Sequence, residues 1–201
     1  MFALIFGLSF LANAQDVQTN QPKGYQFTDI KRLPATSVKD QARAGTCWSW
    51  SGISFFESEM IRTGKEPIDL SAMYIVRHAY SDKATKFVRL HGNMNFAVGG
   101  AFCDVMHVIK NYGIVPMDVY NGLNYGEPNH AFGEIDDVLA GYVNAVIKNS
   151  NKKLSTAWKK GFDGILDAYL GEEPEKFEYK GKEYTPRTFA DEVVGLDMDD
   201  Y

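Results

Sequence analysis

The sequence predicts an α+β domain that is mainly helical and contains one small β-hairpin. Four long segments repeat apolar residues at helical spacing, one short segment alternates apolar and charged residues, and a glycine follows most of these segments. The chain has 201 residues, of which 45% are hydrophobic and 13% aromatic, so it can build a core and is not a disordered chain. Its two cysteines form at most one bridge, which excludes a disulfide-built miniprotein.

The first fourteen residues differ from the rest of the chain. Residues 1–11 form an uncharged apolar run that is followed by Ala12-Asn13-Ala14 and then by the polar stretch 15–21. This order predicts a secretory signal peptide cleaved after Ala14, and hence an exported protein, periplasmic or secreted, that is not held in a membrane after cleavage. The run is too short for a bilayer core of about 30 Å. The alternative is a buried N-terminal strand or helix. Because no Lys or Arg precedes the run, we expect a few more residues before Met1.

The first helix is predicted between Gly45 and Gly64, and it should begin close to Cys47. Glycine at position 64 is a natural stop for a helix. Four large apolar residues recur at helical spacing inside this segment: Trp50, Ile53, Phe56 and Met60.

Three further helices follow from the same periodicity. The first of them covers Phe102–Tyr112 and is closed by Gly113. The next two cover residues 134–148 and residues 155–170, and Gly171 ends the last one.

The C-terminal part is predicted to contain a hairpin and one more helix. Residues 177–184 alternate apolar and charged residues around a Lys-Gly pair, which favours a tight hairpin. A Thr-Pro pair at residues 185–186 is typical of a helix cap and first turn, and Gly195 would end that helix. Residues 120–133, with three glycines and one proline, are the best candidate for a linker.

The net charge of −5 comes entirely from the end of the chain. Residues 191–201 contain five acids and no base, so the other residues balance at 21 acids against 21 bases. A nucleic-acid binder needs a basic face to neutralise phosphates, so we expect no nucleic-acid partner.

Cys47 is the candidate nucleophile. A cysteine at the start of a long helix is well placed for reactivity, because free N–H groups and the helix dipole stabilise a thiolate. Residues 42–45 lack bulk except at Arg43, so a substrate can approach. Gln41 could donate its side-chain amide to an oxyanion, a contact worth about 3 kcal/mol in acyl transfer. The alternative is an inert buried cysteine.

Residues 40–51, DQARAGTCWSWS, resemble the nucleophile motif of the papain-like cysteine peptidases. In that family a glutamine stands six residues before a cysteine that is followed by Trp and opens the central helix. Leu70-Ser71 resembles the turn before the family's next helix. Residues 98–116 resemble its Gly-Gly strand and the helix that follows.

The resemblance assigns roles to five residues. Cys47 would attack the carbonyl group, and Gln41 with the Cys47 N–H would hold the oxyanion. Gly99 and Gly100, together with Trp48, would bind the backbone of an extended peptide substrate, a use of glycine that needs only close approach.

Two departures point to one branch of the family. Ala44 stands where the papain and cathepsin branch has a disulfide cysteine, and residues 134–195 form a long helical insertion. Both features resemble the bleomycin hydrolase and aminopeptidase C branch, which implies aminopeptidase action on peptides and leaves a homo-oligomer open. We therefore divide the chain into a signal peptide, an N-terminal segment at 15–35 and the helical left-hand peptidase domain at 36–201. The signal peptide would make it an exported bacterial relative of enzymes that are usually cytosolic.

The papain-like catalytic histidine and asparagine have no counterparts in the chain. No histidine follows His130, and no Asn-Ser-Trp-Gly segment is present. We expect that the sequence holds the left-hand half of an enzyme and that its partner is the missing right-hand, β-rich half of the same polypeptide. The left-hand half alone is expected to be inactive. The histidines are expected on the surface or on helix faces, and only the last is a candidate stand-in base: His78, His91, His107 and His130.

Cys103 is expected to be a small buried core residue, and a disulfide to Cys47 is not expected. No Cys/His set has zinc-ligand spacing and Gly-Gly alone is no phosphate loop, so we expect no metal and no cofactor. Two other functions stay open. One is a non-catalytic peptide-binding or inhibitory module, and the other is an acyl transferase that uses His130 as its base.

Overall fold

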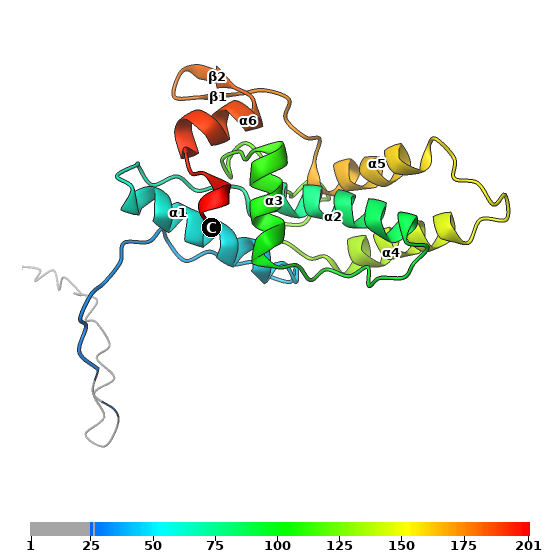
Figure 1. Ribbon diagram of the computed structural model, residues 1–201, viewed down its shortest axis with the longest axis horizontal. Helices are drawn as coiled ribbons and strands as arrows, with labels where there is room; N and C mark the ends of the chain where they lie inside the picture. The colour runs from blue at the N-terminus through cyan, green and yellow to red at the C-terminus, as the bar shows by residue number, and fades with distance from the viewer. Residues whose placement is uncertain (1–24, 26) are drawn as a thin grey trace, which may run out of the picture. The chain divides into compact units, whose positions relative to one another are not determined.

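The computed structural model describes residue 25 and residues 27–201, which fall into two units, residues 1–32 and residues 33–201. The described part of the first unit contains no helix or strand. The predicted signal peptide and its cleavage site lie outside the described residues. No helix in the described part of the chain is long and apolar enough to cross a membrane. All the elements below belong to the second unit (Figure 1).

Helix α1, Cys47–Arg62, begins and ends where the sequence predicts. Its end is set by Thr63 and by Gly64, whose φ of 83° is accessible at little cost only to glycine. It buries three of the four residues of the predicted stripe, Ile53, Phe56 and Met60, whereas the fourth, Trp50, is half-buried.

Helix α2, Ala72–Arg89, is the central helix of the unit and packs against α1, α3, α4 and α5. Ser71 caps its N-terminus by accepting a hydrogen bond from the Tyr74 N–H at 3.0 Å. This confirms the helix that the Leu-Ser resemblance implies. Residues 72–81 are all buried, so the first half of the helix has no polar face, and for that reason periodicity alone does not predict it.

The next three helices lie around α2 (Figure 1). They are α3 at Phe102–Tyr112, α4 at Gly133–Ile147 and α5 at Trp158–Leu170. The first two match the predicted ranges within one residue. Helix α5 begins three residues later than predicted, because residues 155–157 are exposed and have no packing to hold them in a helix.

The predicted hairpin is formed by β1, Phe177–Tyr179, and β2, Lys182–Tyr184, which pair in antiparallel register. Lys180 and Gly181 have φ of 51° and 79°, as a type I′ turn requires. Three aromatic residues of the hairpin pack around the Phe189 ring of the following helix: Phe177, Tyr179 and Tyr184.

The last helix follows the predicted Thr-Pro start. Helix α6, Pro186–Phe189, is capped by Thr185, which accepts from the Thr188 N–H at 3.1 Å. It continues as a π-helical turn at Ala190–Val194 and ends at Gly195, as predicted. A short 3₁₀ turn at Met198–Asp200 follows.

Residues 120–133 do not act as a linker between separate bodies, contrary to the expectation. Phe132 is fully buried, and Asn124 is bonded to α5 through a backbone N–H to the Tyr169 carbonyl and a side-chain amide to the Ala168 carbonyl. The glycines in this segment therefore serve turns within one packed unit.

Candidate active site

Cys47 is the first residue of α1, and its side chain is exposed. Its N–H is one of the first four of the helix, which have no acceptor within the helix itself. The preceding loop is tightly turned: Ala42 and Gly45 have φ of 50° and 63°, and Asp40 Oδ1 accepts from the Ala42 N–H at 2.7 Å. A non-glycine residue in the left-handed region is strained, and such strain is common where a loop positions a reactive group.

The segment at 130–132 braces this loop. The Arg43 N–H donates to the His130 carbonyl at 2.9 Å, and the Phe132 N–H donates to the Arg43 carbonyl at 3.2 Å. These two bonds form a parallel bridge between Arg43 and Ala131. The supposed linker therefore fixes the loop that carries Cys47.

His130 is buried, which contradicts its expected surface position. Its ring meets the Trp50 ring edge-on at 5.8 Å between centroids, and Trp50 Nε1 donates to Thr46 Oγ1 at 3.1 Å. Burial lowers the pKa of His130, so its ring is neutral at neutral pH. The hydrogen bonds of the described residues include none between His130 and Cys47, so the geometry gives the stand-in base no support.

Gly100 and Val98 lie against the start of α1, whereas a Cβ on Gly99 would meet nothing within 4 Å. Trp48 Nε1 donates to the Val98 carbonyl at 3.0 Å. A Cβ on Gly100 would lie 2.5 Å from the Trp48 ring, and a Cβ on Gly45 would lie 3.1 Å from the Val98 side chain. Residues about fifty positions apart in sequence thus form one wall against Gly45 and Trp48, which flank Cys47 in the chain.

Lys83 of α2 is a further residue at this wall. Its ammonium group donates to the Gly99 carbonyl and lies 5.2 Å from the centre of the Trp48 ring. Burial lowers the pKa of Lys83. The sequence holds no local signal for this role, because a lysine in a helix usually belongs to a solvated face.

The side-chain amide of Gln41 is not engaged by the rest of the unit. Its oxygen is buried and has no hydrogen-bond partner among the described residues. The amide therefore has no competing acceptor or donor in this part of the chain that would hold it away from an oxyanion.

Cys103 is exposed, so its expected core position is wrong. It lies in the first turn of α3, where Val105, Val108 and Ile109 form the buried stripe. Both cysteines are free thiols. Both cysteines also lie in the first turn of a helix, so the helix dipole alone does not distinguish Cys47 as the candidate nucleophile. The tightly turned loop before Cys47 and the adjoining segment around Gly100 distinguish it.

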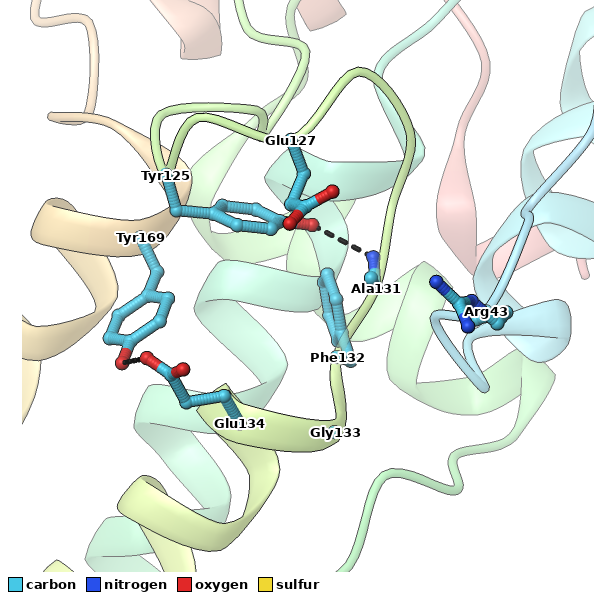
Figure 2. Close-up of a pocket in the computed structure, with 8 residues that line it drawn as sticks. All are labelled: Arg43, Tyr125, Glu127, Ala131, Phe132, Gly133, Glu134 and Tyr169. Carbon is cyan, nitrogen blue, oxygen red and sulfur yellow. Dashed lines mark hydrogen bonds between the residues drawn. The ribbon is translucent and has the colours of Figure 1, made fainter.

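A cavity of about 500 Å³ lies beside the nucleophile loop (Figure 2). Arg43 borders it from the loop, and Tyr125, Phe132, Glu134 and Tyr169 border it from the other side. Figure 2 shows the Tyr169 hydroxyl bonded to the Glu134 carboxylate and the Tyr125 hydroxyl accepting from the backbone of residue 131. These bonds hold the segment that braces the loop.

The other histidines belong to α2, to the turn that follows it and to α3. His91 and His107 are exposed, as expected, whereas His78 is buried with its Nε2 at 2.8 Å from a Glu173 carboxylate oxygen. In the part of the chain that the structure describes, no group of three or more His, Cys, Asp or Glu residues is arranged to hold a metal ion.

Comparison with known proteins gives three findings. The family model described as papain family cysteine protease matches residues 22–160. Aminopeptidase C of Lactococcus lactis subsp. lactis (strain IL1403) is 23% identical over 210 residues, covering 86% of this chain and 46% of the relative. Aminopeptidase C of Lactococcus lactis subsp. cremoris is 24% identical over 213 residues, with the same two coverages.

A solved structure has a similar fold. The crystal structure of PepW from Lactobacillus rhamnosis HN001 (DR20) matches with a TM-score of 0.58 and 21% identity, over 84% of this chain and 46% of that chain. The chain thus spans about half the length of the relatives that it matches. Its fold is the papain-like fold, represented here by the mainly helical part with its small hairpin.

Proposed function

Since the chain belongs to the papain family of cysteine proteases, we propose that Cys47 is the nucleophile of a cysteine-type aminopeptidase. The observation that carries this proposal is the exposed Cys47 at the start of α1, between Gly45, which lies against Val98, and Trp48, which lies against Gly100. The two aminopeptidase C relatives support removal of N-terminal residues and membership of the aminopeptidase C branch.

The reaction is covalent catalysis in two steps. Cys47 Sγ attacks the carbonyl carbon of the peptide bond, and the Cys47 N–H and the Gln41 amide bind the oxyanion that forms. The C–N bond then breaks, the amine leaves with a proton, and a thioester stays on Cys47. Water hydrolyses the thioester, which releases the carboxylic acid and restores the thiol.

Both steps need an imidazole to carry the proton. None of the hydrogen bonds among the described residues joins a histidine to Cys47. We propose that the imidazole and its orienting Asn come from a second, β-rich half of the same protein, and that the 201 residues alone are inactive. The coverage of 46% of each relative supports this division. The exposed face of α1 that carries Cys47, Ser51 and Phe55 is the surface on which that half would lie.

We also propose that the protein is exported and that the signal peptide is removed after Ala14. The support is the apolar run and the small-x-small site in the sequence. N-terminal sequencing of the mature protein tests this, and a mature protein that keeps residues 1–14 would refute it.

A thiol probe tests the nucleophile. The full-length gene product is treated with a peptidyl vinyl sulfone, and the modified peptides are mapped by mass spectrometry. We expect modification at Cys47, none in Cys47→Ser, and full modification in the matched control Cys103→Ser.

The competing function is a non-catalytic peptide-binding module. It is favoured by the same observation that no described histidine is bonded to Cys47. It predicts that the full-length product binds peptides but leaves Cys47 unmodified, or that both cysteines react equally and only after denaturation. Either result would refute the peptidase proposal.

A further inference from the structure

A second cavity, of about 230 Å³, lies between residues 96–98 and the first half of α4. Val98 joins this cavity to the nucleophile loop. Its side chain lines the cavity and lies against Gly45, its carbonyl accepts from Trp48, and Gly99 follows it in the chain. The cavity therefore adjoins the residue that precedes Gly99 and Gly100 and that contacts the nucleophile loop.

The lining of the cavity combines apolar walls with acids. Phe96, Val98 and Leu139 supply apolar surface, and α4 contributes the carboxyl groups of Asp136 and Asp137. Neither acid forms an ion pair with any described residue. A volume below the roughly 300 to 1,000 Å³ of drug-sized ligand pockets suits a single side chain.

A buried hydroxyl group at the cavity has no hydrogen-bond partner. Tyr80 of α2 lines the cavity and is only 2% exposed, and its hydroxyl is unbonded among the described residues. It lies beside the Asp136 carboxyl group, and its interaction with that group acts to lower the pKa of Asp136. A buried hydroxyl left unpaired is costly, so a ligand that bonds to it gains affinity.

The electrostatics of the cavity favour a cation. Burial, and then the neighbouring Asp137, raise the pKa of Asp136 to about 6, and Tyr80 opposes this only in part. The ammonium group of Lys83 lies 5.5 Å from the centre of the Tyr80 ring but donates to the Gly99 carbonyl. It does not neutralise the acids.

We propose that this cavity binds the basic side chain, lysine or arginine, of a peptide that lies along Gly99 and Gly100, and that Asp136 is the specificity-determining residue. The methylene groups would contact the apolar walls, as the stems of long basic side chains do, and the cation would meet Asp136, Asp137 and the Tyr80 hydroxyl. The position of the peptide backbone rests on the proposed function.

A binding measurement tests the inference independently of catalysis. The full-length gene product is titrated with N-acetyl-lysine amide and, as a neutral match, N-acetyl-norleucine amide, and binding is followed by NMR. We expect at least tenfold tighter binding of the lysine compound, strengthening from pH 5 to pH 7. Asp136→Asn should remove the preference and Tyr80→Phe should weaken it severalfold. The control Glu134→Gln, on the same helix but at the other cavity, should leave it unchanged.

Equal affinity for the two compounds, or an unchanged preference in Asp136→Asn, would overturn the inference, as would no binding of either compound. The failure of the proposed function looks different. In that case vinyl sulfones with either side chain fail to modify Cys47 while the lysine amide still binds. Equal rates of Cys47 modification by lysyl and norleucyl vinyl sulfones would overturn the inference and leave the proposed function intact.

Discussion

Gly100→Ala should damage the wall that lies against Trp48. The new Cβ would lie 2.5 Å from two atoms of the Trp48 ring, well inside an ordinary contact distance. The ring cannot simply turn away, because Trp48 is 8% exposed and its Nε1 is bonded to the Val98 carbonyl. Either that bond lengthens or the segment around Gly100 moves outward.

The expected cost follows from overpacking in a well-packed site, which is about 1 to 3 kcal/mol. At the midpoint of this range, 2 kcal/mol corresponds to a fall in Tm of about 4 to 8 °C for a chain of this size. Gly99→Ala is the matched control. A Cβ there meets nothing within 4 Å and the residue does not have positive φ, so its stability should change by less than about 0.5 kcal/mol.

Urea denaturation and thiol labelling together measure the effect. We expect Gly100→Ala to lower the free energy of unfolding and to slow modification of Cys47 by a peptidyl vinyl sulfone, with iodoacetamide, which needs no peptide groove, little affected. Equal stability of the Gly100→Ala and Gly99→Ala proteins would refute the packing of Trp48 beneath Gly100.

Three further predictions concern stability. Lys39→Met should cost about 3 kcal/mol, because it removes the cation that is 2.5 Å from the fully buried Glu57 carboxylate. Lys176→Met, which breaks an exposed pair, should lower the free energy of unfolding far less in the same urea series, and equal losses for the two variants would contradict the argument. The pKa of Asp136 rises from its ordinary 3.8 to about 6, so its protonated form favours folding, and this stabilisation is complete below pH 3.8 and lost as pH rises through 6. The rise corresponds to about 3 kcal/mol, which solvent screening of the half-buried group reduces to about 1 kcal/mol. The free energy of unfolding of Asp136→Asn should therefore exceed that of the wild type by about 1 kcal/mol at pH 7 and equal it at pH 3.5. A constant difference between these two pH values would contradict the raised pKa of Asp136. Thr185→Ala removes the cap of α6 and should cost about 1 kcal/mol by thermal unfolding, and an unchanged Tm would show that the cap is not needed.

The helices with one apolar stripe were predictable because their signals are local. In α1 and α3 the stripe fixes the buried face and a following glycine fixes the end. Helix α2 lacked such a stripe, because even Arg77 and His78 are buried there. Their partners, Asp167 and Glu173, lie about ninety residues away in sequence, so no local pattern reveals them.

Two errors at the site have physical reasons. Cys103 was assigned to the core from the general burial of cysteine, although it stands two residues, or about 200° around the helix, from Val105 on the buried stripe. His130 was expected at the surface because loops usually are. Its burial against Trp50 depends on backbone bonds to Arg43, which are long-range and carry no sequence signal. The motif around Cys47 and the Gly-Gly segment were recognisable, but their contact through Trp48 and Val98 required the fold.

The rate of peptide hydrolysis by the full-length gene product tests the central claim most directly. Release of amidomethylcoumarin from aminoacyl substrates is compared among the wild type, Cys47→Ala and Cys103→Ala. With Cys47 as the nucleophile, Cys47→Ala should lose at least about 10³-fold in kcat/KM, and Cys103→Ala, which removes an exposed thiol at another helix start, should keep the wild-type rate. Wild-type activity in Cys47→Ala, or an equal loss in both variants, would contradict the assignment of the nucleophile.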